Sequence, residues 1–416
     1  MPSMLSEEVI GKITRRGVQE IISHDEFVRM LQEGKPLRLK MGFDPSRPDI
    51  HLGHVVGLRK LRQLQQLGHQ VILIVGDWTA QIGDPSGQSA TRPVLTHDEV
   101  VSNAESYLRQ FFKVVDKDLT EVVWQSEWFG KFSLADVIRL TGKFTVAQFL
   151  QRDDFAKRFQ EHRPIAITEL LYPLLQAYDS LEIRADVEFG GTDQRFNLLV
   201  GRELQQMEGQ RPQQCFLMPI LVGTDGVQKM SKSLDNYVGV EEPPNDMYGK
   251  LMSLPDELIV PYFEYLTDAP QEELTAFSND LASGSVNPME MKKRLAMEIT
   301  AQFHESSAAD AAQENFERVV QRRALPEEIP EFAEPSLAPS FENETRRLSN
   351  IIVDAGLAPS TTEAKRLINQ GAVQIIADPS GDSRTLDRDD RASGLGLEHR
   401  TVIKVGRRRF IRLVNS

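Results

Sequence analysis

The sequence has little cysteine and no long hydrophobic run. Its single cysteine, Cys215, excludes a disulfide framework and a zinc site of the CxxC type, because both need several thiols, and it is typical of a reducing compartment. No apolar run approaches the ~18–20 residues of a membrane span. The first residues carry Glu7 and Glu8 where a signal peptide would be basic and then apolar. We therefore expect a soluble, cytoplasmic protein without a membrane partner.

Positive charge is also scarce, and it is unevenly distributed. The 416 residues carry a net charge of −13, which argues against a general nucleic-acid coat protein, because phosphate binding relies on Lys and Arg. Residues 345–416 hold 13 Lys plus Arg against 8 Asp plus Glu, so this tail carries +5 and the remainder −18. The length exceeds the ~250–300 residues at which single cores stop growing, so we expect two or three domains.

Secondary-structure signals divide the chain into four parts. Strand-like and helix-like segments alternate over residues 1–234, which favours an α/β layer architecture, and residues 235–324 form amphipathic helices. Residues 325–344 hold four prolines and six acidic residues with no basic one, a composition that resists packing and that we interpret as a linker. Residues 345–416 predict two short helices followed by strands. Within the first part we expect helices at 96–112, 168–179 and 193–207 and a strand at 215–222.

The tetrapeptide His51-Leu52-Gly53-His54 stands between the first strand and its helix. Both histidines then lie on one side of a helix N-terminus, whose partial positive charge attracts phosphate. Gly53 would let a flat base lie on the backbone, while the imidazoles can donate to a polyphosphate. Taken alone, this motif is more often a capping histidine than a ligand.

A second motif, Lys229-Met230-Ser231-Lys232-Ser233, follows the expected strand 215–222 on a glycine-containing loop. Two ammonium groups three residues apart on a mobile loop suit a polyphosphate whose charge moves during a reaction. The separation of the two motifs is compatible with two halves of one nucleotide-binding domain, each near the carboxyl ends of parallel strands. Neither a GxGxxG nor a GxxxxGK[ST] pattern follows a strand, which weakens the dehydrogenase and P-loop alternatives.

The two motifs resemble the HIGH and KMSKS signatures of class I aminoacyl-tRNA synthetases, the second without deviation. The resemblance implies a Rossmann-like parallel-sheet catalytic domain with a connective insertion over 1–234, an all-helical anticodon-binding domain over 235–324, and ATP as a substrate with Mg²⁺ on its pyrophosphate oxygens. It also implies that the catalytic residues, which bind the phosphates of ATP, are His51, His54, Lys229, Lys232 and Arg92. It implies as ATP-binding residues Ser46, Gly53, His54, Gly191, Asp193 and Lys232.

Tyr172, Gln176 and Asp179 occupy positions i, i+4 and i+7 of the expected helix 168–179 and so face one way. A polar stripe on an apolar helix is by default solvated surface. If it lines a pocket, the carboxylate can accept a phenolic hydrogen bond, and Tyr172 and Gln176 can offer oxygens to an α-ammonium group. With Asp84 and the turn 190–194, the pattern looks like that of bacterial tyrosyl-tRNA synthetases. This implies a tyrosine–tRNA ligase that binds tyrosine through Asp84, Tyr172, Gln176, Asp179 and Gln194.

Two positions depart from the family pattern. Lys40 stands where better-known relatives place a tyrosine that touches the substrate phenol, so the second partner of that hydroxyl is open. Gln88 replaces a basic residue that relatives use on pyrophosphate. Both departures predict a sister subgroup with a repartitioned site.

The basic tail resembles the small RNA-binding module named after ribosomal protein S-four, through residues 355–360 and 363–368. As its tRNA-binding residues we expect Arg346, Arg347, Lys365, Arg366, Arg407, Arg408 and Arg409. Relatives work as homodimers, which suggests that residues 144–159 contribute to a subunit interface. Two other functions remain open: a tryptophan-type class I ligase, and a regulatory RNA-binding protein that kept the fold and lost the ligase activity.

Overall fold

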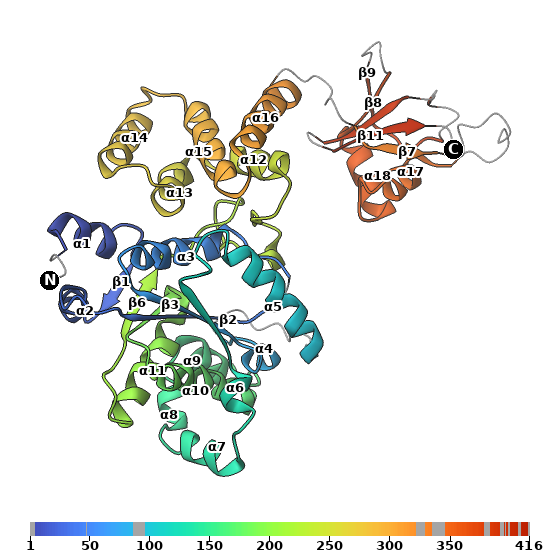
Figure 1. Ribbon diagram of the computed structural model, residues 1–416. Helices are drawn as coiled ribbons and strands as arrows, with labels where there is room; N and C mark the ends of the chain where they lie inside the picture. The colour runs from blue at the N-terminus through green and yellow to red at the C-terminus, as the bar shows by residue number, and fades with distance from the viewer. Residues whose placement is uncertain are drawn as a thin grey trace. The chain divides into compact units, whose positions relative to one another are not determined.

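The structure is a computed structural model that describes residues 5–46, 48–85, 96–321, 329–334, 346–377, 383–391, 395, 397, 400–406 and 409–414. Gln88, Arg92, Arg407 and Arg408 fall outside these ranges. The chain forms two compact units, Met1–Ala309 and Asp310–Ser416, each with its own sheet (Figure 1). Within the described ranges, no helix is both long enough and apolar enough to cross a membrane.

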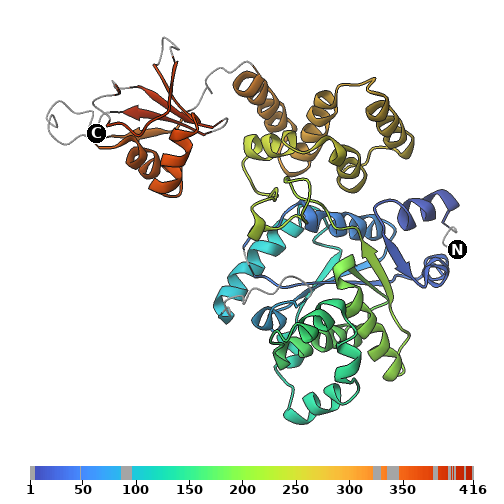
Figure 2. The same ribbon diagram turned by 180° about the vertical axis from the view of Figure 1, so that it is seen from behind.

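The first unit is built on a six-stranded sheet in the order β1-β6-β5-β2-β3-β4, parallel except for β1. Figures 1 and 2 show α3 (Leu52–Gln65) and α5 (His97–Phe111) on one face and α10 (Ile167–Glu182) and α11 (Arg195–Met207) on the other. The expected parallel α/β architecture is confirmed. The strands are β1 (Glu20–Ile22), β2 (Arg38–Phe43), β3 (Gln70–Val75), β4 (Thr120–Trp124), β5 (Val187–Gly191) and β6 (Gln214–Met218).

Local signals placed the three helices expected over residues 96–112, 168–179 and 193–207 correctly. Thr96 caps α5 in a reciprocal capping box with Glu99. The helix expected over 168–179 continues to Glu182 as α10, and the strand expected over 215–222 ends at Met218. The other short elements are α1 (Glu7–Thr14), α2 (His24–Gln32), α4 (Thr79–Ile82), α6 (Ser126–Phe129), α7 (Leu134–Thr141), α8 (Val146–Phe149), α9 (Asp153–Gln160), η1 (Thr192–Gln194) and η2 (Lys232–Leu234).

The expected helices after residue 235 are also present. They are α12 (Pro244–Met252), η3 (Asp256–Leu258), α13 (Ile259–Leu266), α14 (Gln271–Ser283) and α15 (Pro288–Phe303). Because α13 packs against α3, these helices belong to the same compact unit as the sheet. The helix α16 (Ser306–Phe316) spans the boundary between the two units, which thus lies earlier than the expected linker.

The second unit holds a five-stranded sheet in the order β7-β11-β10-β8-β9. Its helices α17 (Leu348–Asp354) and α18 (Thr361–Asn369) pack on the sheet through one apolar core, which includes Leu348, Ile352, Ile368, Val405 and Leu413. The strands and the π-helical turn of this unit are η4 (Glu317–Gln321), β7 (Glu331–Ala333), β8 (Val373–Ile376), β9 (Ser383–Leu386), β10 (Val402–Val405) and β11 (Arg409–Val414).

Residues 329–334 correct the interpretation of 325–344 as a linker that resists packing. They include β7, which pairs in parallel with β11, and Ile329 packs with Val319, Val402 and Phe410. Glu334 is fully buried and forms an ion pair with Arg346 at 3.2 Å. A composition rich in Pro and Glu did not reveal this strand, because its partner lies some 80 residues later in the sequence. The rest of that segment falls outside the described residues.

Candidate active site

The expected site residues gather at the carboxyl edge of the parallel sheet. Asp44 follows β2, Gln125 follows β4, and Asp193 follows β5, while Asp84 lies just beyond α4. The central strand β2 lies between β3 and β5, so the connections leave it toward opposite sides of the sheet. A crevice at such a switch point is where α/β sheets bind their ligands.

The two histidines of the first motif lie at the N-terminus of α3. The Nδ1 atom of His51 accepts a hydrogen bond from the Gly53 N–H at 3.1 Å, and Nδ1 of His54 accepts one from the His51 N–H at 3.2 Å. Burial lowers the pKa of both rings, that of His54 to about 4, and Lys232 lowers both further. A neutral ring whose Nδ1 accepts carries its proton on Nε2, so each histidine presents an N–H donor.

Gly53 has a steric role at this turn. A Cβ atom at this position would lie 2.9 Å from Cε1 and Nδ1 of His51, so the imidazole ring occupies the space that glycine leaves open. Ser46, another predicted ATP-binding residue, lies in the loop after β2 and donates its N–H to the Asp44 carbonyl at 2.7 Å.

The lysines of the second motif reach two different parts of this edge. Nζ of Lys229 lies 3.3 Å from Oδ2 of Asp193, next to Gly191 at the end of β5. Nζ of Lys232 donates to the carbonyl of Asp49, two residues before His51, and stands over the ring of Tyr107. The structure therefore brings together the two motifs that the sequence separates.

Two features that the sequence did not reveal hold the second motif in place. Asn236 is buried, accepts from the Ser231 N–H at 2.8 Å and donates to the Lys229 carbonyl at 3.1 Å. Directly after it, the backbone pairs with the entry to the first motif: Leu52 donates to Val238 and Val240 donates to Ile50. The only signal for Asn236 in the sequence is its place three residues beyond the motif.

Tyr172, Gln176 and Asp179 all lie on α10, as expected. The hydroxyl of Tyr172 donates to Oδ2 of Asp44 at 2.8 Å, and burial together with this carboxylate raises the pKa of the phenol well above its usual range. The other oxygen of Asp44 accepts from the Thr79 hydroxyl at 2.7 Å. Asp44 is thus a site residue that the motifs missed.

Asp179 lies at the buried end of this row. Its two oxygens accept from Gln125 Nε2 at 2.8 Å and from Trp128 Nε1 at 3.2 Å. Burial raises the pKa of Asp179 to about 7, against the opposing effect of the nearby Lys40. Gln125 also accepts from the Thr79 N–H at 3.0 Å, so it connects α4 to α10. Neither Gln125 nor Trp128 has a sequence signal of its own.

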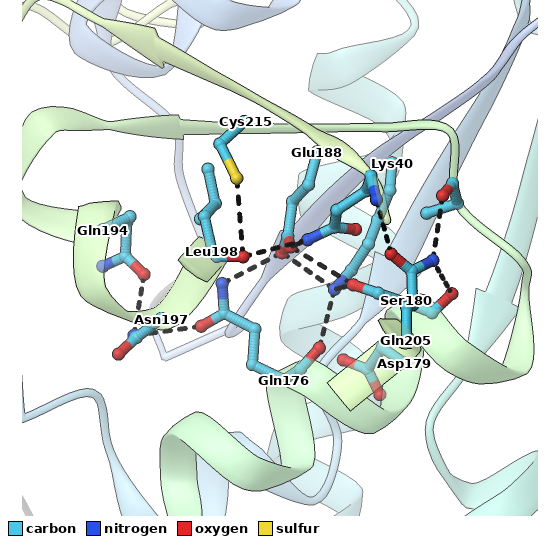
Figure 3. A network of polar contacts seen from close by, with 12 residues as sticks. Lys40, Gln176, Asp179, Ser180, Glu188, Gln194, Asn197, Leu198, Gln205 and Cys215 are labelled. Carbon is cyan, nitrogen blue, oxygen red and sulfur yellow. Dashed lines mark hydrogen bonds and ion pairs between the residues drawn. The ribbon is translucent and has the colours of Figure 1, made fainter. Parts of the chain in front are cut away.

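A chain of amides links the remaining tyrosine-binding candidates (Figure 3). Gln194 donates to Asp84 at 2.6 Å, and Asn197 donates to the side-chain oxygens of both Gln194 and Gln176 at 3.1 Å. Gln176 in turn donates to Glu188 at 3.1 Å. The structure therefore connects Asp84, Gln194 and Gln176, which come from three separate segments.

Lys40 is fully buried in β2, and its ammonium group is bound to Glu188, Ser180 and the carbonyl of Gln176. Among the residues that the structure describes, no group of three or more His, Cys, Asp or Glu side chains is arranged to hold a metal ion.

The basic residues of the second unit differ in how exposed they are. Arg346 is half-buried between Glu334 and Asp354, whereas Arg347, Lys365, Arg366 and Arg409 are exposed. Arg347 and Arg366 pair with Asp389 at 3.7 Å and with Glu363 at 2.6 Å, and Arg409 donates to the Leu357 carbonyl. Arg346 thus also has a structural role, which is to anchor the end of β7.

Comparison with known proteins finds a matching family model in each of the two units. Residues 32–321 match the family described as tRNA synthetases class I (W and Y), and residues 346–375 match the S4 domain. The chain is 56% identical over 410 residues to the tyrosine–tRNA ligase of Dehalococcoides mccartyi strain CBDB1, covering 98% of this chain and 99% of the relative. It is 48% identical over 411 residues to that of Thermotoga maritima, covering 99% and 98%.

A solved structure has a similar fold. The tyrosyl-tRNA synthetase of Archaeoglobus fulgidus, complexed with L-tyrosine, matches with a TM-score of 0.60 at 24% identity and covers 74% of this chain and 99% of its own.

Proposed function

The chain belongs to the class I tRNA synthetases for tryptophan and tyrosine, and from this we infer that it is a tyrosine–tRNA ligase. Its relatives at 46–56% identity over nearly the whole chain are tyrosine–tRNA ligases, which favours tyrosine over tryptophan. The observation that carries the catalytic proposal is the convergence of Lys232 with the paired histidines at the carboxyl edge of the sheet. A protein that had lost the ligase activity would have no need of this arrangement.

In the first step, the tyrosine carboxylate attacks the α-phosphate of ATP and displaces pyrophosphate. An α-carboxyl titrates near ~3.5, so the nucleophile is already ionised at neutral pH and no general base is needed. We assign to the Nε2–H groups of His51 and His54 and to the ammonium groups of Lys229 and Lys232 the stabilisation of the phosphate charge. Arg92, which falls outside the described residues, stays a predicted member of this set.

The amino acid lies, in this proposal, between α10 and the ends of the strands. Asp84, Tyr172, Gln176 and Gln194 hold its ammonium and carboxylate groups, and Asp179 accepts the phenolic hydrogen bond. The ribose of ATP lies at Gly191 and Asp193, and the base lies near Gly53. Mg²⁺ would be held by the phosphates of bound ATP and by waters, which are its usual ligands, and would neutralise phosphate charge.

In the second step, the adenylate acylates the terminal ribose of tRNA(Tyr). The S4-like second unit would bind this tRNA through the exposed Arg347, Lys365, Arg366 and Arg409, with Arg407 and Arg408 as predicted additions. We assign the reaction to the cytoplasm. The single cysteine agrees with a reducing compartment, because a lone thiol cannot form a disulfide within the chain.

We also propose that the protein works as a homodimer. The segments α7 to α10 carry strongly exposed apolar side chains, among them Ile138 (62%), Phe159 (62%) and Ile167 (79%). Large apolar side chains gathered on neighbouring segments mark interaction surfaces. The predicted interface segment 144–159 lies within this region.

Tyrosine-dependent ATP–pyrophosphate exchange by the purified full-length protein tests the catalytic proposal. We expect exchange with tyrosine and not with tryptophan. Exchange that depends on tryptophan, or none at all with either amino acid, would contradict it.

A further inference from the structure

Two buried charges have no role in the proposed reaction. Lys40 in β2 and Glu188 in β5 are direct partners in the strand register, with side chains 0% and 1% exposed and Nζ 2.8 Å from Oε1 (Figure 3). The remaining hydrogens of the ammonium group go to Ser180 Oγ at 2.6 Å and the Gln176 carbonyl at 2.7 Å. Apolar replacements of a buried ion pair are often neutral or stabilising, so stability alone does not explain it.

The pair determines which way the amide of Gln176 faces. In its ion pair with Lys40, the carboxylate of Glu188 offers only acceptor oxygens to its other neighbours. Glu188 therefore accepts a hydrogen bond from the NH₂ group of Gln176, at 3.1 Å. The Oε1 atom of Gln176 must then face the opposite way, where it accepts from Asn197 at 3.1 Å.

The next amides continue with the same polarity. Asn197 donates from the same nitrogen to Gln194 Oε1, and its own oxygen faces Arg152 at 3.4 Å. The NH₂ group of Gln194 faces the carboxylate of Asp84. As a result, the amide oxygens of Gln176 and Gln194 both lie within hydrogen-bond distance of the Asn197 nitrogen, and the carboxylate of Asp84 lies next to Gln194. Such a cluster of acceptors suits a group that only donates, such as an ammonium ion.

We propose that Lys40 and Glu188 form a positioning pair, which turns the amide oxygen of Gln176 toward the α-ammonium group of the bound amino acid. The proposal rests on the tyrosine–tRNA ligase function and adds the origin of the selectivity for the amino group. Glu188 does not touch the substrate. It acts through Gln176, and Lys40 acts through Glu188.

The test compares two ligands, L-tyrosine and deaminotyrosine, in which a hydrogen replaces the α-ammonium group. Calorimetry on the full-length protein gives the affinity for each, and their ratio measures recognition of the ammonium group. In Lys40→Met/Glu188→Leu, Gln176 loses the acceptor that holds its NH₂ group. We expect the ratio to fall roughly tenfold, as for a lost hydrogen bond to a charged group, with little change for deaminotyrosine. A loosened fold would weaken both ligands alike and leave the ratio unchanged.

Glu188→Gln is the conservative rescue. Its remaining oxygen can still face Lys40 and Gln176. Its NH₂ group meets the amide of Gln213, which donates to Glu188 in the unchanged protein and turns over to offer its Oε1, an atom with no hydrogen-bond partner among the described residues. We expect a ratio near that of the unchanged protein. Removing Lys40 as well, in Lys40→Met/Glu188→Gln, frees this amide to turn, so the ratio should fall again. If Lys40→Met/Glu188→Leu does not fold, Lys40→Met/Glu188→Gln provides the test.

Gln205→Met is the matched control. Gln205 donates to the carbonyl of Ser180, in the last turn of α10, at 3.1 Å and to that of Ala185, just after the helix, at 2.9 Å. It thus supports the end of α10 near Lys40 but lies outside the chain of amides. We expect an unchanged ratio. An unchanged ratio in both double variants, or an equal fall in Gln205→Met, would overturn the proposal. Failure of the unchanged protein to bind tyrosine would instead contradict the proposed function.

Discussion

The ammonium group of Lys229 lies 3.3 Å from Oδ2 of Asp193. This contact joins the loop after β6 to the end of β5, where the resemblance to known synthetases implies the ATP ribose. The carboxylate provides a counter-charge for a lysine that is itself exposed. We expect Lys229 to exchange this partner for phosphate oxygens when the nucleotide binds.

Replacing either loop lysine should slow adenylate formation while leaving tyrosine affinity nearly unchanged. Lys229→Ala and Lys232→Ala each remove a donor that acts mainly on transition-state charge, and a comparable donor contributes roughly 2.7–4 kcal/mol, or about 10²–10³ in rate. Pyrophosphate exchange and tyrosine titration measure the two effects. The exposed Lys131→Ala is the control. Normal exchange rates in both loop variants would remove the loop from the mechanism.

Tyrosine binding should depend on the ionisation of Asp179. Burial raises the pKa of this carboxyl to about 7, so it is protonated below that pH and accepts hydrogen bonds fully only above it. We therefore expect tyrosine affinity to rise between pH 6 and pH 8. Phenylalanine, which lacks the hydroxyl, should show no such rise, and Asp179→Asn should abolish it. Parallel pH profiles for the two amino acids would place Asp179 outside the side-chain pocket.

A chain that ends at Phe316 should keep adenylate formation and lose most of its affinity for tRNA. This cut follows α16 and removes β7, Ile329 and the five-stranded sheet together, whereas a cut near residue 344 would leave β7 without its partner β11. The +5 tail supplies phosphate contacts that the acidic body cannot, so full-length binding should weaken steeply with salt. An unchanged Michaelis constant for tRNA in the shortened chain would show that the tail does not bind RNA.

The homodimer should depend on the exposed apolar side chains of α7 and α9. Ile138→Glu and Phe159→Glu place a charge on the proposed interface and should shift sedimentation toward the monomer, because a charge buried without a partner is costly. Leu119→Glu alters an exposed leucine (56%) outside these helices and should not. If all three variants sediment alike, the interface lies elsewhere.

Local sequence patterns were sufficient to predict the helices expected over residues 96–112, 168–179 and 193–207 and to find the motifs at residues 51–54 and 229–233. The capping box at Thr96, the apolar run of β3 and the spacing of Tyr172 and Gln176 on one helix are all properties of neighbouring residues, so the sequence reveals them directly. The same holds for the two short helices and most strands of the S4-like unit. Recognition of the family rested on these local motifs.

The contacts that assemble the site could not be found in this way. Asp44 meets Tyr172, Gln125 meets Asp179, and Lys40 meets Glu188, each across at least 54 residues of sequence. Each pair depends on which strands lie side by side and in which register, and a shift of one residue would turn Lys40 to the other face of the sheet. The sequence by itself therefore determined the chemistry at this edge. Only the tertiary structure decided the partners of the buried polar groups, because burial leaves each of them dependent on a neighbour that the chain supplies from far away.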